Sequence, residues 1–264
     1  MKQKRTKNQK IRGIQAVLER HRRFDFRYIP LLGEWNMPDK TYAYRQRFFD
    51  RILTGFWRTF LKIFTRPLFW IAYGGIHLHG KENRKALKKS GAICVCNHFN
   101  YLDTLLVRTA AGHFRSFHTM APWNNKKGFG GHIIRHGGMW PFSKDREATR
   151  NLLTEMERRL KQGKIVNFYA EQAMWTNYQK PRPMKDGAFH YAMKFSVPVL
   201  PIFCTFKRNK KGHLKRVRVH ILPAIYADGN LGRAERMQDM KSRAEAEWIA
   251  CYESAYGIPL KYED

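Results

Sequence analysis

Residues 92–103 read AICVCNHFNYLD, and this stretch decides the fold of the chain. The first five residues are apolar, which predicts a buried strand over Ala92–Cys96. A helical pattern then runs over Leu102–Ala111, so a strand, a short polar loop and a helix follow one another directly. This order is typical of an α/β sheet, in which ligands bind beyond the carboxyl ends of the strands. His98 stands at that position.

The rest of the chain alternates short strand-like runs with helical patterns. Further strands are expected at Ile76–His79, Ser116–Met120, Ile165–Tyr169, Val197–Phe206 and Val217–Leu222. Further helices are expected at Arg146–Lys161, Ala188–Phe195 and Arg233–Tyr256, and the glycines near residue 130 predict a flexible connection. The predicted fold class is therefore α/β, a mixed, mostly parallel sheet flanked by helices.

The composition indicates a folded, strongly basic protein. Its 264 residues are 43% hydrophobic and 14% aromatic, which suffices for a core and excludes disorder throughout. There are 50 Lys and Arg against 21 Asp and Glu, a net charge of +29, so nucleic acid, an anionic membrane face or phosphorylated substrates are the expected partners. Four cysteines without a C-x-x-C pair exclude a disulfide scaffold and favour a reducing, cytosolic side.

The amino-terminal part divides into two predicted segments before the α/β domain of residues 76–264. Residues 1–43 form a basic arm, which is either an electrostatic tether to a membrane or a solvated tail. The beginning of this arm lacks the apolar run of a secretory signal.

Residues 44–75 are predicted to form amphipathic helices that lie in a membrane interface. Basic side chains fall on one helix face and large apolar ones on the other, and Pro67 is expected to stop or kink the first helix. The basic side chains of this face are Arg47, Arg51, Arg58, Lys62 and Arg66. Charges interrupt the segment too often for a spanning helix. An ordinary amphipathic helix packed on a core is the alternative, but the aromatic and cationic faces favour the interface.

His98 and Asp103 form a candidate general base. A carboxylate five residues after the histidine, in the first turn of a helix, can fold back and accept a hydrogen bond from Nδ1. Nε2 then stays neutral and can take a proton from an attacking hydroxyl. The alternative is a helix-capping Asp103 beside a surface histidine. Cys94 and Cys96 lie in the predicted buried strand and are interpreted as core residues rather than nucleophiles.

Three further blocks follow the NHFNYLD stretch of residues 97–103. They read GMWPFSKDR at residues 138–146, FYAEQ at 168–172 and KDGA at 185–188, the last leading into VPVLP at 197–201. In order and spacing the four blocks resemble the glycerolipid acyltransferases, the 1-acylglycerol-3-phosphate acyltransferase group. The resemblance covers about Ile76 to Leu222, and it implies that His98 is the base and Asp103 its orienting partner.

The resemblance also implies an acceptor site. A cation of the second block binds the acceptor's phosphate in this family; Lys144 falls in register and Arg146 lies close by. Glu171 of the third block would accept hydrogen bonds from the acceptor. Alternatively, Glu171 belongs to a structural ion pair, and Lys144 and Arg146 are ordinary charges at a helix end.

The third block departs from the family pattern. Where the family has Gly-Thr-Arg after the glutamate, this chain has Gln-Ala-Met at residues 172–174, so the usual phosphate-binding arginine is missing. Lys180, Arg182 or Lys185 in the following loop could supply the charge instead. The other possibility is an acceptor with a different head group.

Residues and resemblance together predict an O-acyltransferase that works on the cytoplasmic face of a membrane as a peripheral or monotopic protein. The acyl donor is acyl-CoA or acyl carrier protein, and the expected acceptor is 1-acyl-sn-glycerol-3-phosphate, which would give phosphatidic acid. Another lysophospholipid or a glycolipid is the alternative acceptor. No cofactor or metal is expected, since His132 and His136 lack the glutamate of the H-E-x-x-H zinc motif. From another class, a basic nucleic-acid-binding protein remains the alternative.

Overall fold

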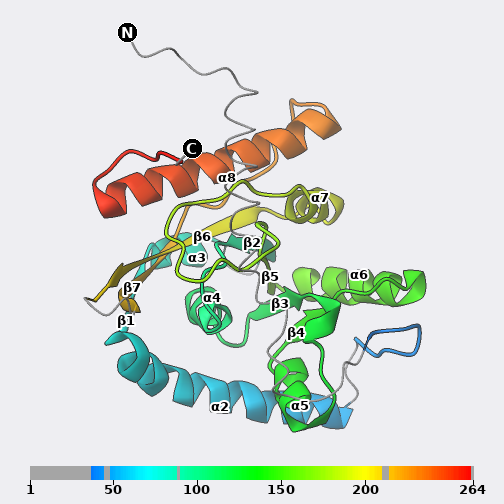
Figure 1. Cartoon of the computed structure of the whole chain (residues 1–264). Helices are drawn as coiled ribbons and strands as arrows, with labels where there is room; N and C mark the ends of the chain where they lie inside the picture. Colours follow the sequence, from blue (N-terminus) through cyan, green and yellow to red (C-terminus); the bar gives the residue numbers. More distant parts are fainter. Residues whose placement is uncertain (1–36, 45–47, 88–89, 210–213, 263–264) are drawn as a thin grey trace.

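The computed structural model describes residues 37–44, 48–87, 90–209 and 214–262, and it confirms the predicted fold class. Within these residues, a mixed, mostly parallel sheet of seven strands lies between helices (Figure 1). The strands are β1 (Ile76–His79), β2 (Ala92–Cys96), β3 (Ser116–Met120), β4 (Met139–Pro141), β5 (Ile165–Phe168), β6 (Val199–Arg208) and β7 (Leu214–Ile221). The helices are α2 (Phe48–Tyr73), α3 (Lys81–Ala86), α4 (Asp103–Ala111), the 3-10 turn η1 (Pro122–Asn124), α5 (Gly128–His136), α6 (Arg146–Lys161), α7 (Gly187–Lys194) and α8 (Arg233–Tyr256).

The sheet order β1-β7-β6-β2-β5-β3-β4 places β2 near the centre. Strands β6, β2, β5, β3 and β4 run parallel, whereas β7 is antiparallel to β6 and carries β1 beside it. Every residue of β2 is buried, because helices cover both faces of a central parallel strand. The carboxyl ends of the five parallel strands meet at one edge of the sheet, where the loop that begins with Asn97 emerges.

Two cores fill the space on either side of the sheet. Side chains of α6, α7 and α8 pack on one face, including Leu152, Phe189 and Trp248. The other face is covered by α4 and the end of α2, with Leu106 and Phe69 among its buried residues. Figure 1 shows α7 and α8 on one side of the sheet and α4 and α2 on the other.

The connection after β3 is more regular than the sequence predicts. The glycines around residue 130 indicated a flexible segment, but Gly128–His136 forms helix α5, and β4 follows it as a short edge strand. The glycine at position 131 serves close packing: a Cβ there would come within 1.7 Å of the carbonyl oxygen of Lys126. Glycine frequency alone did not distinguish this role from flexibility.

Helix α2 continues through Pro67 to Tyr73, so of the two predicted effects of this proline, a stop or a kink, the stop is wrong. The face that packs on the protein carries Thr54, Arg58, Thr65, Phe69 and Tyr73. The opposite face exposes the large apolar side chains of Phe48, Phe49, Ile52, Phe56, Phe60, Ile63, Phe64, Leu68, Trp70 and Ile71. No helix of the described residues is both long and apolar enough to cross a membrane.

Helical periodicity placed Arg58 on an outward basic face, but in the structure its side chain does not lie there. The side chain is buried on the side of α2 that faces the protein. Its guanidinium donates to the carbonyl oxygens of Phe114 and Ser116 and lies 4.2 Å from the centre of the Phe117 ring. Burial and the nearby charge of Arg108 lower the pKa of Arg58 to about 9. Periodicity grouped the cations on one face, but that face turns partly toward the protein.

Phe69 and Trp70 test this orientation of α2, because they are adjacent and only 1% and 72% exposed. Phe69→Ala should lower the free energy of unfolding by about 3–5 kcal/mol, since it leaves a cavity in the core. Trp70→Ala should change it by about 0.5 kcal/mol or less in detergent-free buffer. Urea denaturation of the two variants measures the difference, and equal losses would contradict the orientation described.

Candidate functional site

His98 and Asp103 meet at the carboxyl end of β2. The loop after the strand turns back because Asn100 closes it: its side-chain oxygen accepts from the backbone N–H of Leu102, and its carbonyl accepts from that of Asp103. Asp103 thereby begins α4 with its carboxylate directed at the loop. The distance between His98 Nδ1 and Asp103 Oδ2 is 2.6 Å, so the predicted contact is present.

The two side chains differ in their access to solvent. The Asp103 side chain is 1% exposed, and its Oδ2 also lies near the backbone N–H groups of Phe99 and Asn100, at 3.2 and 3.4 Å. The His98 side chain is 24% exposed. An ionised carboxylate can only accept, so Nδ1 of the neutral ring carries the hydrogen and Nε2 keeps its lone pair. This arrangement can act as a general base toward a hydroxyl.

Two tyrosines that the sequence analysis did not single out also belong to the site. The hydroxyl of Tyr169, just after β5, donates to Asp103 Oδ1 at 2.6 Å, and that of Tyr73 in α2 donates to the side chain of Asn100 at 2.8 Å. Burial and the Asp103 carboxylate raise the pKa of both phenols, so both remain hydrogen-bond donors. The position of Tyr169 at a strand end was the available sequence signal.

Glu171 and Arg182 form a buried ion pair that holds the backbone of His98. Glu171 Oε2 accepts from the backbone N–H of His98 at 2.9 Å and from Arg182 Nη2 at 2.5 Å, while Oε1 accepts from the backbone N–H of Arg182. Arg182 also donates to the carbonyl oxygens of Ala173 and His98, and its guanidinium lies 4.3 Å from the Trp175 ring. These contacts match the structural alternative for Glu171. Substrate contact by either residue stays a prediction.

Lys144, Arg146 and Lys185 are exposed, and the described contacts do not bring them to the dyad. Lys144 and Arg146 follow β4, which is separated from β2 by β5 and β3. At about 4.8 Å between neighbouring strands, this separation is about 14 Å across the sheet. They lie on the same edge of the sheet as His98, and their role in binding a phosphate stays a prediction.

The cysteines beside the site are core residues. Cys94, Cys96 and Cys204 are buried, and burial raises the pKa of the thiols of Cys94 and Cys96. A neutral, enclosed thiol is a poor nucleophile. Next to them, the side-chain amide of Asn97 donates to the carbonyl of Cys204 and accepts from its N–H, which ties the end of β2 to β6.

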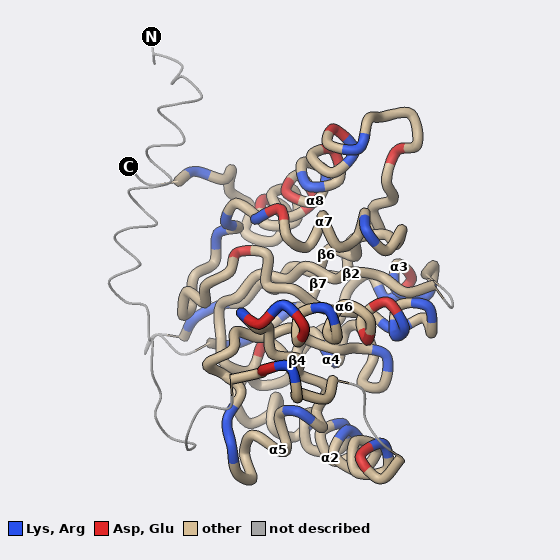
Figure 2. Tube along the Cα trace, turned by 90° about the vertical axis from the view of Figure 1, so that its right-hand side faces the viewer, with Lys and Arg blue, Asp and Glu red and all other residues tan. Residues whose placement is uncertain are grey.

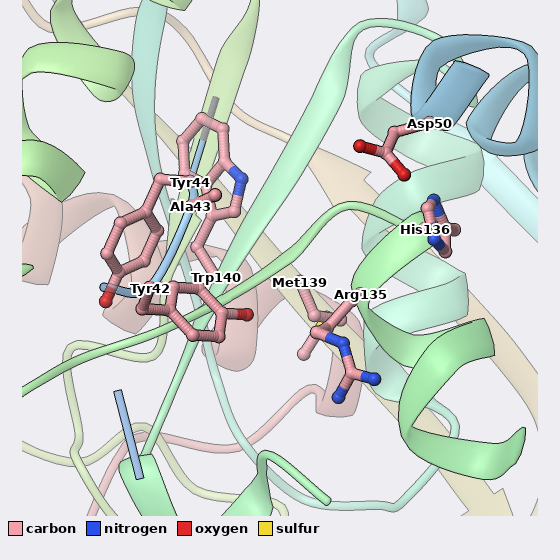
Figure 3. Close-up of a pocket in the computed structure, with 8 residues that line it drawn as sticks. All are labelled: Tyr42, Ala43, Tyr44, Asp50, Arg135, His136, Met139 and Trp140. Atoms are coloured by element: carbon pink, nitrogen blue, oxygen red, sulfur yellow. The ribbon is translucent and has the colours of Figure 1, made fainter. Parts of the chain in front are cut away.

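A pocket elsewhere on the chain is lined by residues 42–44 and by side chains from α2, α5 and β4 (Figure 3). Neither member of the dyad lines it. His136 in its wall is hydrogen-bonded through Nδ1 to Thr54 Oγ1, at 3.0 Å.

In the part of the chain that the structure describes, no three His, Cys, Asp or Glu residues are grouped as a metal site. Tyr44, the first residue of the predicted interfacial segment, donates to the carbonyl of Pro141 and so lies against β4. Of the predicted basic arm, residues 1–36 lie outside the described residues.

Comparisons with known proteins concern the family and the fold of the chain. A family model described as Acyltransferase matches residues 75–205. Among solved structures, the crystal structure of the 1-acyl-sn-glycerophosphate (LPA) acyltransferase PlsC from Thermotoga maritima is similar, with a TM-score of 0.57 and 18% sequence identity. The match covers 80% of this chain and 83% of that one. No curated protein matches. The family model and the shared fold confirm the resemblance that the four sequence blocks predict.

The ion pair of Glu171 and Arg182 can be tested through stability. Glu171→Ala should lower the free energy of unfolding by about 3–5 kcal/mol, because it leaves the Arg182 charge buried without its partner. Asp186→Ala removes an exposed ion pair with Lys241 and should cost about 1 kcal/mol or less. Chemical denaturation compares the two. A Glu171→Ala protein as stable as the wild type would show that the carboxylate is not needed to hold the loop.

Proposed function

Because residues 75–205 belong to the acyltransferase family, we propose that this chain transfers a fatty acyl group from an acyl thioester to a hydroxyl of a lysolipid. The observation that carries the proposal is the contact of 2.6 Å between His98 Nδ1 and the buried Asp103 carboxylate. It leaves a partly exposed, neutral imidazole at the edge of the sheet, with Nε2 available to a substrate alcohol.

In the proposed reaction, Nε2 of His98 takes the proton of the acceptor hydroxyl while its oxygen attacks the thioester carbonyl carbon. Asp103 stabilises the imidazolium that forms. The tetrahedral intermediate then collapses, the carbon–sulfur bond breaks, and the thiolate leaves and recovers the proton from His98. The products are an ester and a free thiol, and no acyl-enzyme is formed. Buried Cys94 and Cys96 are therefore not required as nucleophiles.

For the acceptor we propose 1-acyl-sn-glycerol-3-phosphate, which would yield phosphatidic acid. The exposed cations at the carboxyl edge of the sheet, Lys144, Arg146 and Lys185, are available to a phosphate. Arg182 is held by Glu171 and is a weaker candidate for this contact. A different lysophospholipid or a glycolipid is the alternative acceptor, and acyl-CoA or acyl carrier protein is the donor.

We also propose that the protein works at the cytoplasmic face of a membrane, bound through α2. Ten large apolar side chains of this helix are exposed, whereas a soluble surface normally carries such residues singly. Arg51, Lys62 and Arg66 on the same helix are exposed, and Figure 2 shows basic segments along α2 and before α5. Each such cation near an anionic surface contributes about 1 kcal/mol to binding. Aromatic side chains gathered on one helix face suit a lipid interface better than a nucleic-acid groove.

The catalytic proposal is tested by His98→Ala and Asp103→Ala. His98→Ala should reduce kcat by about 100-fold to 10,000-fold, the usual contribution of a positioned base. Asp103→Ala should reduce it severely as well, with folding checked by circular dichroism. Product formation is read by mass spectrometry from a panel of lysolipids with acyl-CoA and acyl carrier protein donors. His190→Ala, at an exposed position of α7, is the control. Undiminished transfer by the His98→Ala protein would contradict the proposal.

The membrane proposal is tested with vesicles of phosphatidylglycerol and phosphatidylcholine in a flotation assay. Ile52→Glu combined with Ile63→Glu should weaken binding at least about tenfold, since two exposed apolar side chains of α2 are lost from the lipid contact. Tyr226→Glu combined with Ile258→Glu changes equally exposed residues outside α2 and should bind like the wild type. The same loss in both double variants would argue against α2 as the binding surface.

A further inference from the structure

Tyr169 contacts both members of the dyad. Its ring is stacked on the imidazole of His98, with centroids 3.9 Å apart and planes at 16°, and its hydroxyl lies 2.6 Å from Asp103 Oδ1. We infer that Tyr169 is a positioning residue for the His98 base: its hydroxyl orients the carboxylate and its ring orients the imidazole. This inference rests on the proposed acyl transfer, in which His98 takes the proton.

The two oxygens of Asp103 have separate partners. Oδ2 is occupied by His98 Nδ1 and by the backbone N–H groups of the loop, whereas Oδ1 accepts from Tyr169. A carboxylate held on one oxygen alone can rotate about its terminal bond, which would carry Oδ2 away from the histidine. The hydrogen bond from Tyr169, which follows a different strand, prevents that rotation. The donor therefore contributes to geometry as well as to charge.

The hydroxyl of Tyr169 can act only as a donor toward Asp103. A phenol has one hydrogen, and the carboxylate can only accept it. The second contact of this hydroxyl, with Thr104 Oγ1 at 3.0 Å, is then donated by the threonine. Burial and the charge of Asp103 raise the pKa of Tyr169, because both disfavour a phenolate. The donor stays protonated across the working range of an enzyme.

The stacked ring controls the direction of Nε2. Among the described contacts, Glu171 and Arg182 engage the backbone N–H and carbonyl of His98, so the imidazole itself is held by Asp103 and Tyr169. One hydrogen bond at Nδ1 leaves the ring free to tilt about that bond. A flat neighbour at 3.9 Å removes this freedom and keeps Nε2 pointed in one direction.

The hydroxyl also affects how strongly the pair holds a proton. When His98 is protonated, the imidazolium and the Asp103 carboxylate form an ion pair, and the bond from Tyr169 draws part of the carboxylate charge away. Without this bond the carboxylate attracts the imidazolium more strongly. At low pH a smaller fraction of the enzyme then has an unprotonated His98, and the imidazolium returns its proton less readily to the leaving thiolate.

Tyr169→Phe and Tyr169→Leu separate the two contributions. Tyr169→Phe keeps the stacked ring and should lower kcat about fivefold to tenfold with unchanged KM, and the acid limb of kcat/KM should move up by about half to one pH unit. Tyr169→Leu also removes the stacking and should lower kcat about 100-fold. Tyr191→Phe removes a phenol that stacks on Phe168 and should behave like the wild type. Thermal unfolding confirms that each variant is folded.

The inference is overturned if Tyr169→Phe leaves both kcat and the acid limb unchanged, or if it raises KM alone, which would indicate a substrate contact. A second measurement needs no turnover: the low-field proton resonance of His98 Nδ1–H should move further downfield in Tyr169→Phe, because the carboxylate becomes a stronger acceptor. An unmoved resonance would also overturn it. If the wild type transfers no acyl group, the proposed function fails and this resonance alone decides the role of Tyr169.

Discussion

The buried carboxylate of Asp103 is the centre on which the candidate site depends. It joins the loop after β2, the first turn of α4 and the end of β5, because its two oxygens accept from His98, from the loop backbone and from Tyr169. A carboxylate taken out of water is costly unless donors surround it, and here the donors are also the groups that have to be positioned. Satisfying one buried charge therefore orders the site.

A second buried carboxylate, that of Glu171, holds the backbone of His98 in place. Glu171 holds the N–H of His98 and pairs with Arg182, which in turn reaches the carbonyl of His98. The main chain of the histidine is thus hydrogen-bonded to one ion pair, and its ring contacts Asp103 and Tyr169. Both carboxylates follow parallel strands or begin a helix at the same sheet edge, which explains why side chains far apart in the chain converge there.

Helix α2 connects the site with the surface proposed to bind lipid. Its protein-facing side ends with Tyr73, which donates to Asn100 in the loop after β2, while its other side is apolar and exposed. The same helix therefore contacts the loop and presents the surface on which we propose that a lipid substrate arrives. Arg58, buried under the helix with backbone carbonyls as its partners, shows that a cation on a helix can serve packing rather than surface charge.

Much of the fold could be predicted from local pattern. Apolar runs with β-branched residues predicted β2 and β5 to within a residue, and the spacing of apolar side chains predicted α6 and α8 at their observed bounds. The contact of His98 with Asp103 was also predictable, because five residues and one helix start determine it. These features depend on residues that are close together in the chain, so the local sequence pattern is enough to predict them.

Only the tertiary structure decided the rest. The pairing of Glu171 with Arg182, the contact of Tyr169 with both members of the dyad and the burial of Arg58 all involve residues brought together by the order of strands in the sheet. Sequence periodicity shows which side chains share a face, but not which face turns inward. That choice follows from the summed burial and hydrogen bonding of the whole chain, and local spacing does not contain it.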